Sequence, residues 1–129
     1  MATITAQATG NFSATGTWTG GVVPGSGDTA ESGNYTVTID TNITVATLKA
    51  TGSGYFNTTS GGISITADIV CATTNGAGAF RGAHNSGLVE ITGNVTAGSV
   101  NNVPAIYMNA TGNLTVNGNI TAGSGSASY

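Results

Sequence analysis

The most regular feature of the chain is an alternation of β-branched apolar residues with Thr, Ser or Asn. Four segments share this alternation, at residues 37–46, 63–72, 89–98 and 114–123. It places apolar side chains on one face of a β-strand and polar side chains on the other. A short polar stretch divides each segment, at residues 40–42, 66–68, 92–94 and 117–119. Because Asn, Asp and Gly in these stretches suit bends, we interpret each segment as a strand, a tight bend and a second strand.

The four segments recur at a nearly constant interval. The positions that align them are Ile39, Ile65, Ile91 and Val116, which are 26, 26 and 25 residues apart. A second apolar site recurs at Phe56, Phe80 and Ile106 and predicts a third short strand in the repeat. Repeats of this length are typical of solenoids, whose units bury their apolar faces only against neighbouring units. An antiparallel sandwich is the alternative, but its hairpins would not explain so regular a recurrence.

We therefore predict an all-β fold, a short parallel β-helix (solenoid) of about four coils with an N-terminal cap. Residues 1–34 would form the N-terminal arm and cap, and residues 35–129 would form coils of about 26 residues. The four aligned positions would stack as one internal aliphatic ladder. Because the open β-edges at a solenoid end must be covered, we assign Phe12 and Trp18, which precede the first coil, to the cap.

Composition and charge exclude several classes of function. Charged residues make up 5% of the chain, the net charge is −3, and Lys49 and Arg81 are the only basic side chains. Nucleic-acid binding is not expected, because neutralising phosphates needs clustered Lys and Arg. A membrane partner is not expected either, since no apolar run approaches the roughly 20 residues of a membrane-spanning helix. The N-terminus also lacks the pattern of a secretory signal.

Residues with catalytic or metal-binding chemistry are few. The carboxylates Asp40, Asp68 and Glu90 should lie on the outward face, staggered rather than paired as glycoside hydrolysis requires. His84 is the only histidine and is expected in a solvated loop, and the single cysteine, Cys71, should be a small buried apolar residue. A metal site normally needs several such ligands. We therefore expect no enzyme activity, no cofactor and no metal.

Residues 12–48 carry the most specific sequence, with Trp-Thr-Gly-Gly at 18–21, Pro-Gly-Ser-Gly-Asp at 24–28 and Val-Thr-Ile-Asp at 37–40. This stretch resembles the opening of right-handed β-helix proteins among tailed-bacteriophage structural proteins and bacterial surface adhesins. For a short chain, the resemblance implies a capsid decoration (cement) protein at the capsid surface of a virion, with the major capsid protein as a partner. The alternatives are a tail fibre or spike segment, and a carbohydrate-binding adhesin module with Trp18 and Tyr55 as stacking platforms.

The C-terminal part of the chain carries more apolar residues than one inner ladder requires. The interface candidates are Val100, Val103, Pro104, Ile106, Tyr107, Met108 and Tyr129. We expect identical subunits to cover them, in a homotrimer. The contacts would be apolar and hydrogen-bonded, because the chain has so little charge.

Overall fold

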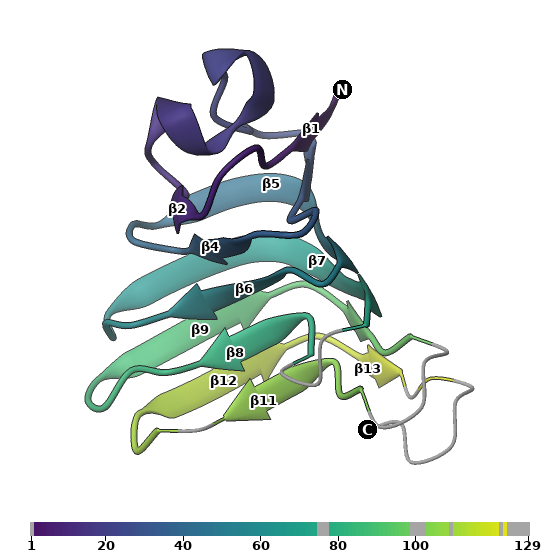
Figure 1. Ribbon diagram of the computed structural model, residues 1–129. Helices are drawn as coiled ribbons and strands as arrows, with labels where there is room; N and C mark the ends of the chain where they lie inside the picture. Colours follow the sequence, from purple (N-terminus) through teal and green to yellow (C-terminus); the bar gives the residue numbers. More distant parts are fainter. Residues whose placement is uncertain (1, 75–77, 99–102, 109, 122, 124–129) are drawn as a thin grey trace.

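The chain winds into a parallel β-solenoid of about four coils, which confirms the predicted fold class (Figure 1). The structure is a computed structural model that describes residues 2–74, 78–98, 103–108, 110–121 and 123. The paired strands of its two sheets are parallel. The coils stack from the N-terminal end at the top of Figure 1 to the last strands at the bottom.

Each coil contributes one side to a broad sheet and one side to a narrow sheet. The broad sheet contains β1 (Thr3–Thr5), β3 (Thr29–Glu31), β5 (Ile43–Gly52), β7 (Ile63–Thr73), β9 (Leu88–Thr92), β10 (Val95–Thr96), β12 (Asn113–Asn117) and β13 (Ile120–Thr121). The narrow sheet contains β2 (Gly10–Asn11), β4 (Thr36–Thr38), β6 (Tyr55–Thr58), β8 (Phe80–Gly82) and β11 (Ile106–Met108). Two short 3₁₀ helices, η1 (Thr15–Thr17) and η2 (Thr19–Gly21), lie between β2 and β3.

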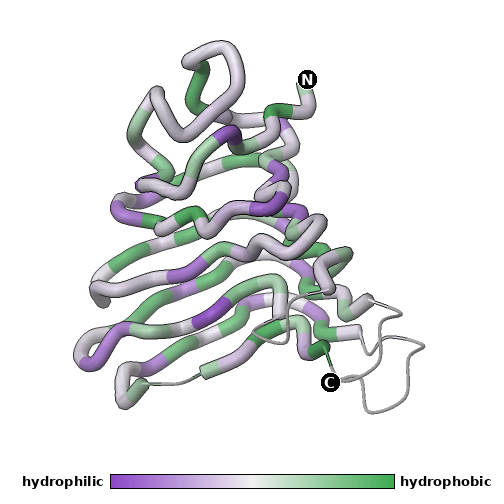
Figure 2. Tube along the Cα trace, in the orientation of Figure 1, coloured by the Kyte–Doolittle hydropathy of each residue, from purple (hydrophilic) through white to green (hydrophobic). Residues whose placement is uncertain are grey.

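Alternating burial fills the space between the two sheets with apolar side chains. In β7 every second residue is buried, and Figure 2 shows hydrophobic and hydrophilic positions interleaved along the coils. Three members of the predicted ladder align: Ile65 pairs with Ile91, and Ile91 pairs with Val116. The fourth member was wrong, because the partner of Ile65 in the preceding coil is Ile43. Ile39 is also buried, but it follows β4 and bonds through its backbone to Asn57 beside the narrow sheet.

This correction has a simple cause in coil length. Ile65 and Ile91 are one interval of 26 residues apart, whereas Thr29 pairs with Thr47, only 18 residues further along. The first inter-sheet connections are therefore shorter than the later ones, and the aligned interval steps from one sheet to the other. The narrow sheet behaves as predicted: Phe56 pairs with Phe80, and Phe80 pairs with Ile106.

The predicted bends have different structures in different coils. Residues 93–94 and 118–119 interrupt the broad sheet between β9 and β10 and between β12 and β13. Residues 66–68 do not form a bend, because they lie inside the continuous strand β7. Residues 40–42 connect the narrow sheet to the broad sheet.

Asp and Asn side chains at these positions bond to the next coil. The backbone N–H of Asn94 donates to Asp68 Oδ1 at 2.8 Å, and the N–H of Asn119 donates to Asn94 Oδ1 at 3.1 Å. In the same way the N–H of Ser64 donates to Asn42 Oδ1 at 2.9 Å. Each side chain thus satisfies a backbone donor one coil further along, where a break leaves it without a ladder partner.

The N-terminal residues close one end of the solenoid. The strands β1 to β3 already belong to the two sheets, so coil formation begins before residue 35. Phe12 and Trp18 are buried, with their rings edge to face and 5.0 Å between centroids. The indole N–H of Trp18 donates to the Phe12 carbonyl at 2.8 Å. The loop that carries η1 and η2 lies over the end of the coils (Figure 1).

Candidate functional site

The three carboxylates considered for catalysis do not form a pair. Glu90 lies opposite Ser64, four residues before Asp68 on β7. Four strand residues correspond to about 13 Å, more than the roughly 5 to 9.5 Å that separates the carboxyl groups of glycosidases. Asp40 instead accepts hydrogen bonds from the backbone N–H and the hydroxyl of Ser13 in the N-terminal arm.

His84 is buried, so the expectation of a solvated loop histidine was wrong. Its Nε2 lies 2.8 Å from the carbonyl oxygen of Asn113, and its Nδ1 lies 3.0 Å from the hydroxyl of Thr58. Because a carbonyl only accepts, Nε2 is the donor, and Nδ1 then accepts from Thr58. Gly112 packs against the imidazole so closely that a Cβ there would overlap the ring. His84 therefore ties together three successive coils.

Within the residues that the structure describes, no three His, Cys, Asp or Glu side chains come together to hold a metal ion. No helix in that part of the chain is long and apolar enough to cross a membrane. A polar depression of about 560 Å³ lies at the corner formed by residues 59–62 and 85–87. Its lining consists of Gly, Ser, Thr and Asn, without a charged or aromatic side chain. The free thiol of Cys71 is buried, as expected.

The interface candidates fall into three groups. Val103 and Pro104 are buried within the chain, and Ile106 is half-buried beside Phe80. Tyr107 and Met108 are exposed, at 42% and 37%. Val100 and Tyr129 lie outside the described residues. Burial of Val103 and Pro104 in the chain's own core leaves them unavailable to a partner.

The last described rung of the inner ladders is exposed where the rung before it is not. Val89, Ile91 and Val95 are fully buried. Their partners one coil further along are Leu114, Val116 and Ile120. Leu114 and Val116 are only partly buried, and Ile120 is 65% exposed. We call Leu114, Val116 and Ile120 the terminal apolar surface.

A second surface lies on the outer face of the narrow sheet. Asn57 pairs with Arg81 on the next strand, and Arg81 pairs with Tyr107 on the strand after that. Nη1 of Arg81 donates to the hydroxyl oxygen of Tyr55 at 3.4 Å. We call Tyr55, Asn57, Arg81 and Tyr107 the Arg81 row. Trp18, proposed from the sequence as a stacking platform beside Tyr55, is fully buried in the N-terminal arm and offers no ring face to a ligand.

Comparison with known protein families, curated proteins and solved structures finds no match to the chain. The sequence analysis missed the buried role of His84, although Thr58 precedes it by one coil interval. It also missed the Arg81 row, apart from Tyr55 and Tyr107. The signal for both was the repeat itself, since residues one interval apart on the same face become neighbours.

Asp28 gives the N-terminal arm a pH-dependent contact. Its carboxylate accepts the backbone N–H of Gly25 at 2.9 Å and that of Ala2 at 3.0 Å. These hydrogen bonds, the one from Gly25 first, hold the pKa of Asp28 below its ordinary value, because they stabilise the charged form.

We therefore predict that the contact is complete above the ordinary carboxyl pKa and is lost as the pH falls through the lower value of the folded protein. The amide resonances of Ala2 and Gly25 should shift together in an NMR titration to acid pH. In Asp28→Asn this shared titration should disappear. Titration of the two amides at unrelated pH values would contradict the assignment.

The contacts of His84 predict a large effect of an apolar replacement. In His84→Phe the ring volume remains, but the Asn113 carbonyl and the Thr58 hydroxyl lose their partner. Each unsatisfied buried polar group costs about 1–3 kcal/mol. We expect the free energy of unfolding in urea to fall by about 2–5 kcal/mol. The control Asn85→Ala changes the exposed neighbouring residue and should alter it by less than about 0.5 kcal/mol.

Proposed function

We propose that this chain is a non-enzymatic structural protein of a bacteriophage virion, which decorates the capsid surface as a homotrimer and binds the major capsid protein. The observation that carries the proposal is the terminal apolar surface. Its three side chains continue inner ladders that are fully buried one coil earlier. Burying an aliphatic side chain contributes about 1.5–3 kcal/mol, so contact with a partner at this surface is strongly favoured.

The distribution of charge supports an interface of this kind. All seven charged residues lie at or before Glu90, and residues 91–129 contain none. Copies of the C-terminal coils can therefore approach each other, or a capsid surface, without like-charge repulsion. Such contacts depend on apolar burial and hydrogen bonds, and added salt screens little of their energy.

The resemblance of residues 12–48 to phage β-helix proteins supports the virion assignment within this class. The rigid stack of coils suits a protein that only binds and stabilises, because the solenoid holds its outer faces in fixed register. A tail fibre or spike segment would use the same stack. A head location is preferred here because the chain is short.

The interface predicts a specific effect of one substitution. Ile120→Asp places a charge on the terminal apolar surface, and the association constant measured by light scattering at micromolar concentration should fall at least tenfold. Val22→Asp is the matched control, because Val22 is also exposed, at 56%, but lies in the N-terminal arm. The unmodified chain should have about three times the 12.5 kDa mass of one chain. A unmodified chain that stays monomeric would contradict the trimer.

The location predicts the composition of purified particles. Mass spectrometry of phage particles released by the strain that carries the gene should detect this chain, and tailless heads separated on a density gradient should retain it. Detection in detached tails alone would instead support the fibre or spike assignment. Absence from all particles, with the major capsid protein detected, would contradict a virion role.

A further inference from the structure

The outer face of the narrow sheet has a composition unlike the rest of the molecule's surface. The broad sheet presents mostly Thr, Ser and Asn to solvent, with isolated charges such as Lys49 and Glu90. The five strands of the narrow sheet contain one charged residue, Arg81, and two tyrosines, Tyr55 and Tyr107. Arg and Tyr are the residues most enriched where proteins bind other molecules.

The Arg81 row is ordered by contacts within the chain. The hydroxyl of Thr38 donates to Asn57 Oδ1 at 2.8 Å, which turns the amide so that its nitrogen carries the remaining donors. The bond from Arg81 to Tyr55 fixes the guanidinium beside a phenol ring. Neighbouring members of the row on successive strands are about 4.8 Å apart. The row is thus a preformed line of donors and aromatic rings that runs across the coils.

The size of this face decides what kind of molecule fits it. Five strands span about 19 Å, and three to four residues of each strand span about 12 Å, so the face covers about 230 Å². A stable protein–protein interface needs about 800 Å² from each partner. The narrow sheet alone is too small for a folded protein and matches a slender, linear ligand.

The chemistry of the row points to a sugar chain with carboxylates. A tyrosine offers an apolar ring face, against which the C–H face of a sugar ring packs, and a hydroxyl for hydrogen bonding. The Asn57 amide suits sugar hydroxyls, and a guanidinium pairs with a carboxylate through parallel N–H donors. We infer that the narrow sheet binds a linear acidic oligosaccharide across its strands, through Tyr55, Asn57, Arg81 and Tyr107. This inference does not depend on the proposed virion role.

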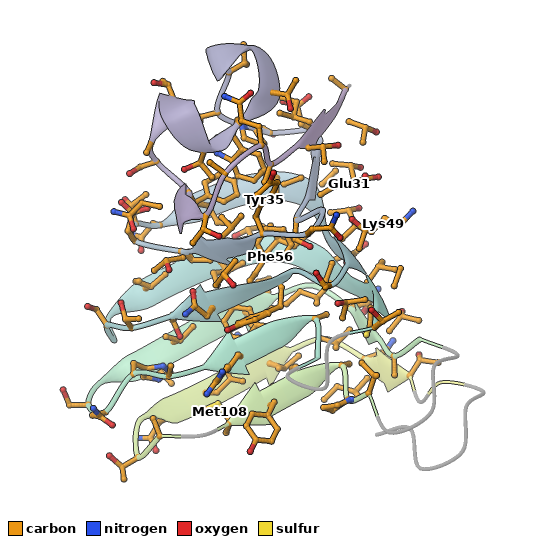
Figure 3. All side chains as sticks on the ribbon, in the orientation of Figure 1. Glu31, Tyr35, Lys49, Phe56 and Met108 are labelled. Carbon is orange, nitrogen blue, oxygen red and sulfur yellow. The ribbon has the colours of Figure 1, made fainter. Side chains whose placement is uncertain are left out.

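The other basic residue provides a contrast within the chain. Lys49 lies on the broad sheet directly opposite Glu31, and Figure 3 shows these two side chains together at the side of the coils. An acidic ligand at Lys49 would meet the Glu31 carboxylate as well. Met108, on β11 beside Tyr107, lies at the lower front of the same view and borders the Arg81 row.

The test uses isothermal titration calorimetry and backbone amide NMR on the full chain, with tetragalacturonate as the acidic probe and maltotetraose as the neutral one. Tetragalacturonate should bind saturably and shift amide signals of β6, β8 and β11. Arg81→Gln should weaken tetragalacturonate binding at least tenfold, and Arg81→Lys should weaken it less, because it keeps the charge but loses the planar donors. Tyr107→Ala should weaken the binding of both sugars.

The matched control is Lys49→Gln, which removes the same charge from the broad sheet and should change the affinity less than twofold. Equal losses in Arg81→Gln and Lys49→Gln would show unspecific charge attraction and overturn the inference. So would the absence of saturable binding at millimolar tetragalacturonate. If the β6, β8 and β11 signals respond to protein concentration and not to sugar, the row is a subunit contact and the inference is wrong. Each of these outcomes leaves the particle composition, and hence the virion role, to its own test.

Discussion

The structure depends on one constraint: a coil of this solenoid buries almost nothing by itself. Each inner side chain is covered by its equivalents in the coils before and after, as Ile91 is covered between Ile65 and Val116. Backbone hydrogen bonds follow the same rule, because each strand pairs only with strands of adjacent coils. Stability therefore comes from contacts between neighbouring coils, and the two ends are the places where such contacts run out.

The chain treats its N-terminal end with its own residues. Phe12 and Trp18 fill the space beyond the first rung, and the polar groups of the arm are satisfied locally, including the indole N–H on the Phe12 carbonyl. Asp28 and Asp40 attach the arm to the coils through backbone N–H groups of Ala2 and Ser13. At the other end the ladders stop at Ile120 with most of that side chain in water. This asymmetry is why the proposed partner contact is placed on the terminal apolar surface.

The sequence predicted the parts of the fold that repeat at a constant interval. Ile65, Ile91 and Val116 align because their coils have nearly equal length. Ile39 was misplaced because the earlier coils are shorter, and a fixed interval then crosses from one sheet to the other. His84 was misjudged for a related reason: its burial comes from Thr58 and Asn113, which lie 26 and 29 residues away. Polar residues read one at a time as loop positions can thus be inner rungs, when the equivalent position of the neighbouring coil is also polar.

The outward positions carry information of a different kind. Packing does not restrict them, so Thr, Ser and Asn suffice wherever a solenoid face only meets water, as on most of the broad sheet. Tyr107 and Arg81 exceed that need, since an exposed aromatic ring or a guanidinium held by Tyr55 adds little to coil stacking. The same interval that stacks the core also brings these outward residues into one row. A repeat can therefore build a linear binding face from single residues contributed by successive coils, without a pocket and without a separate domain.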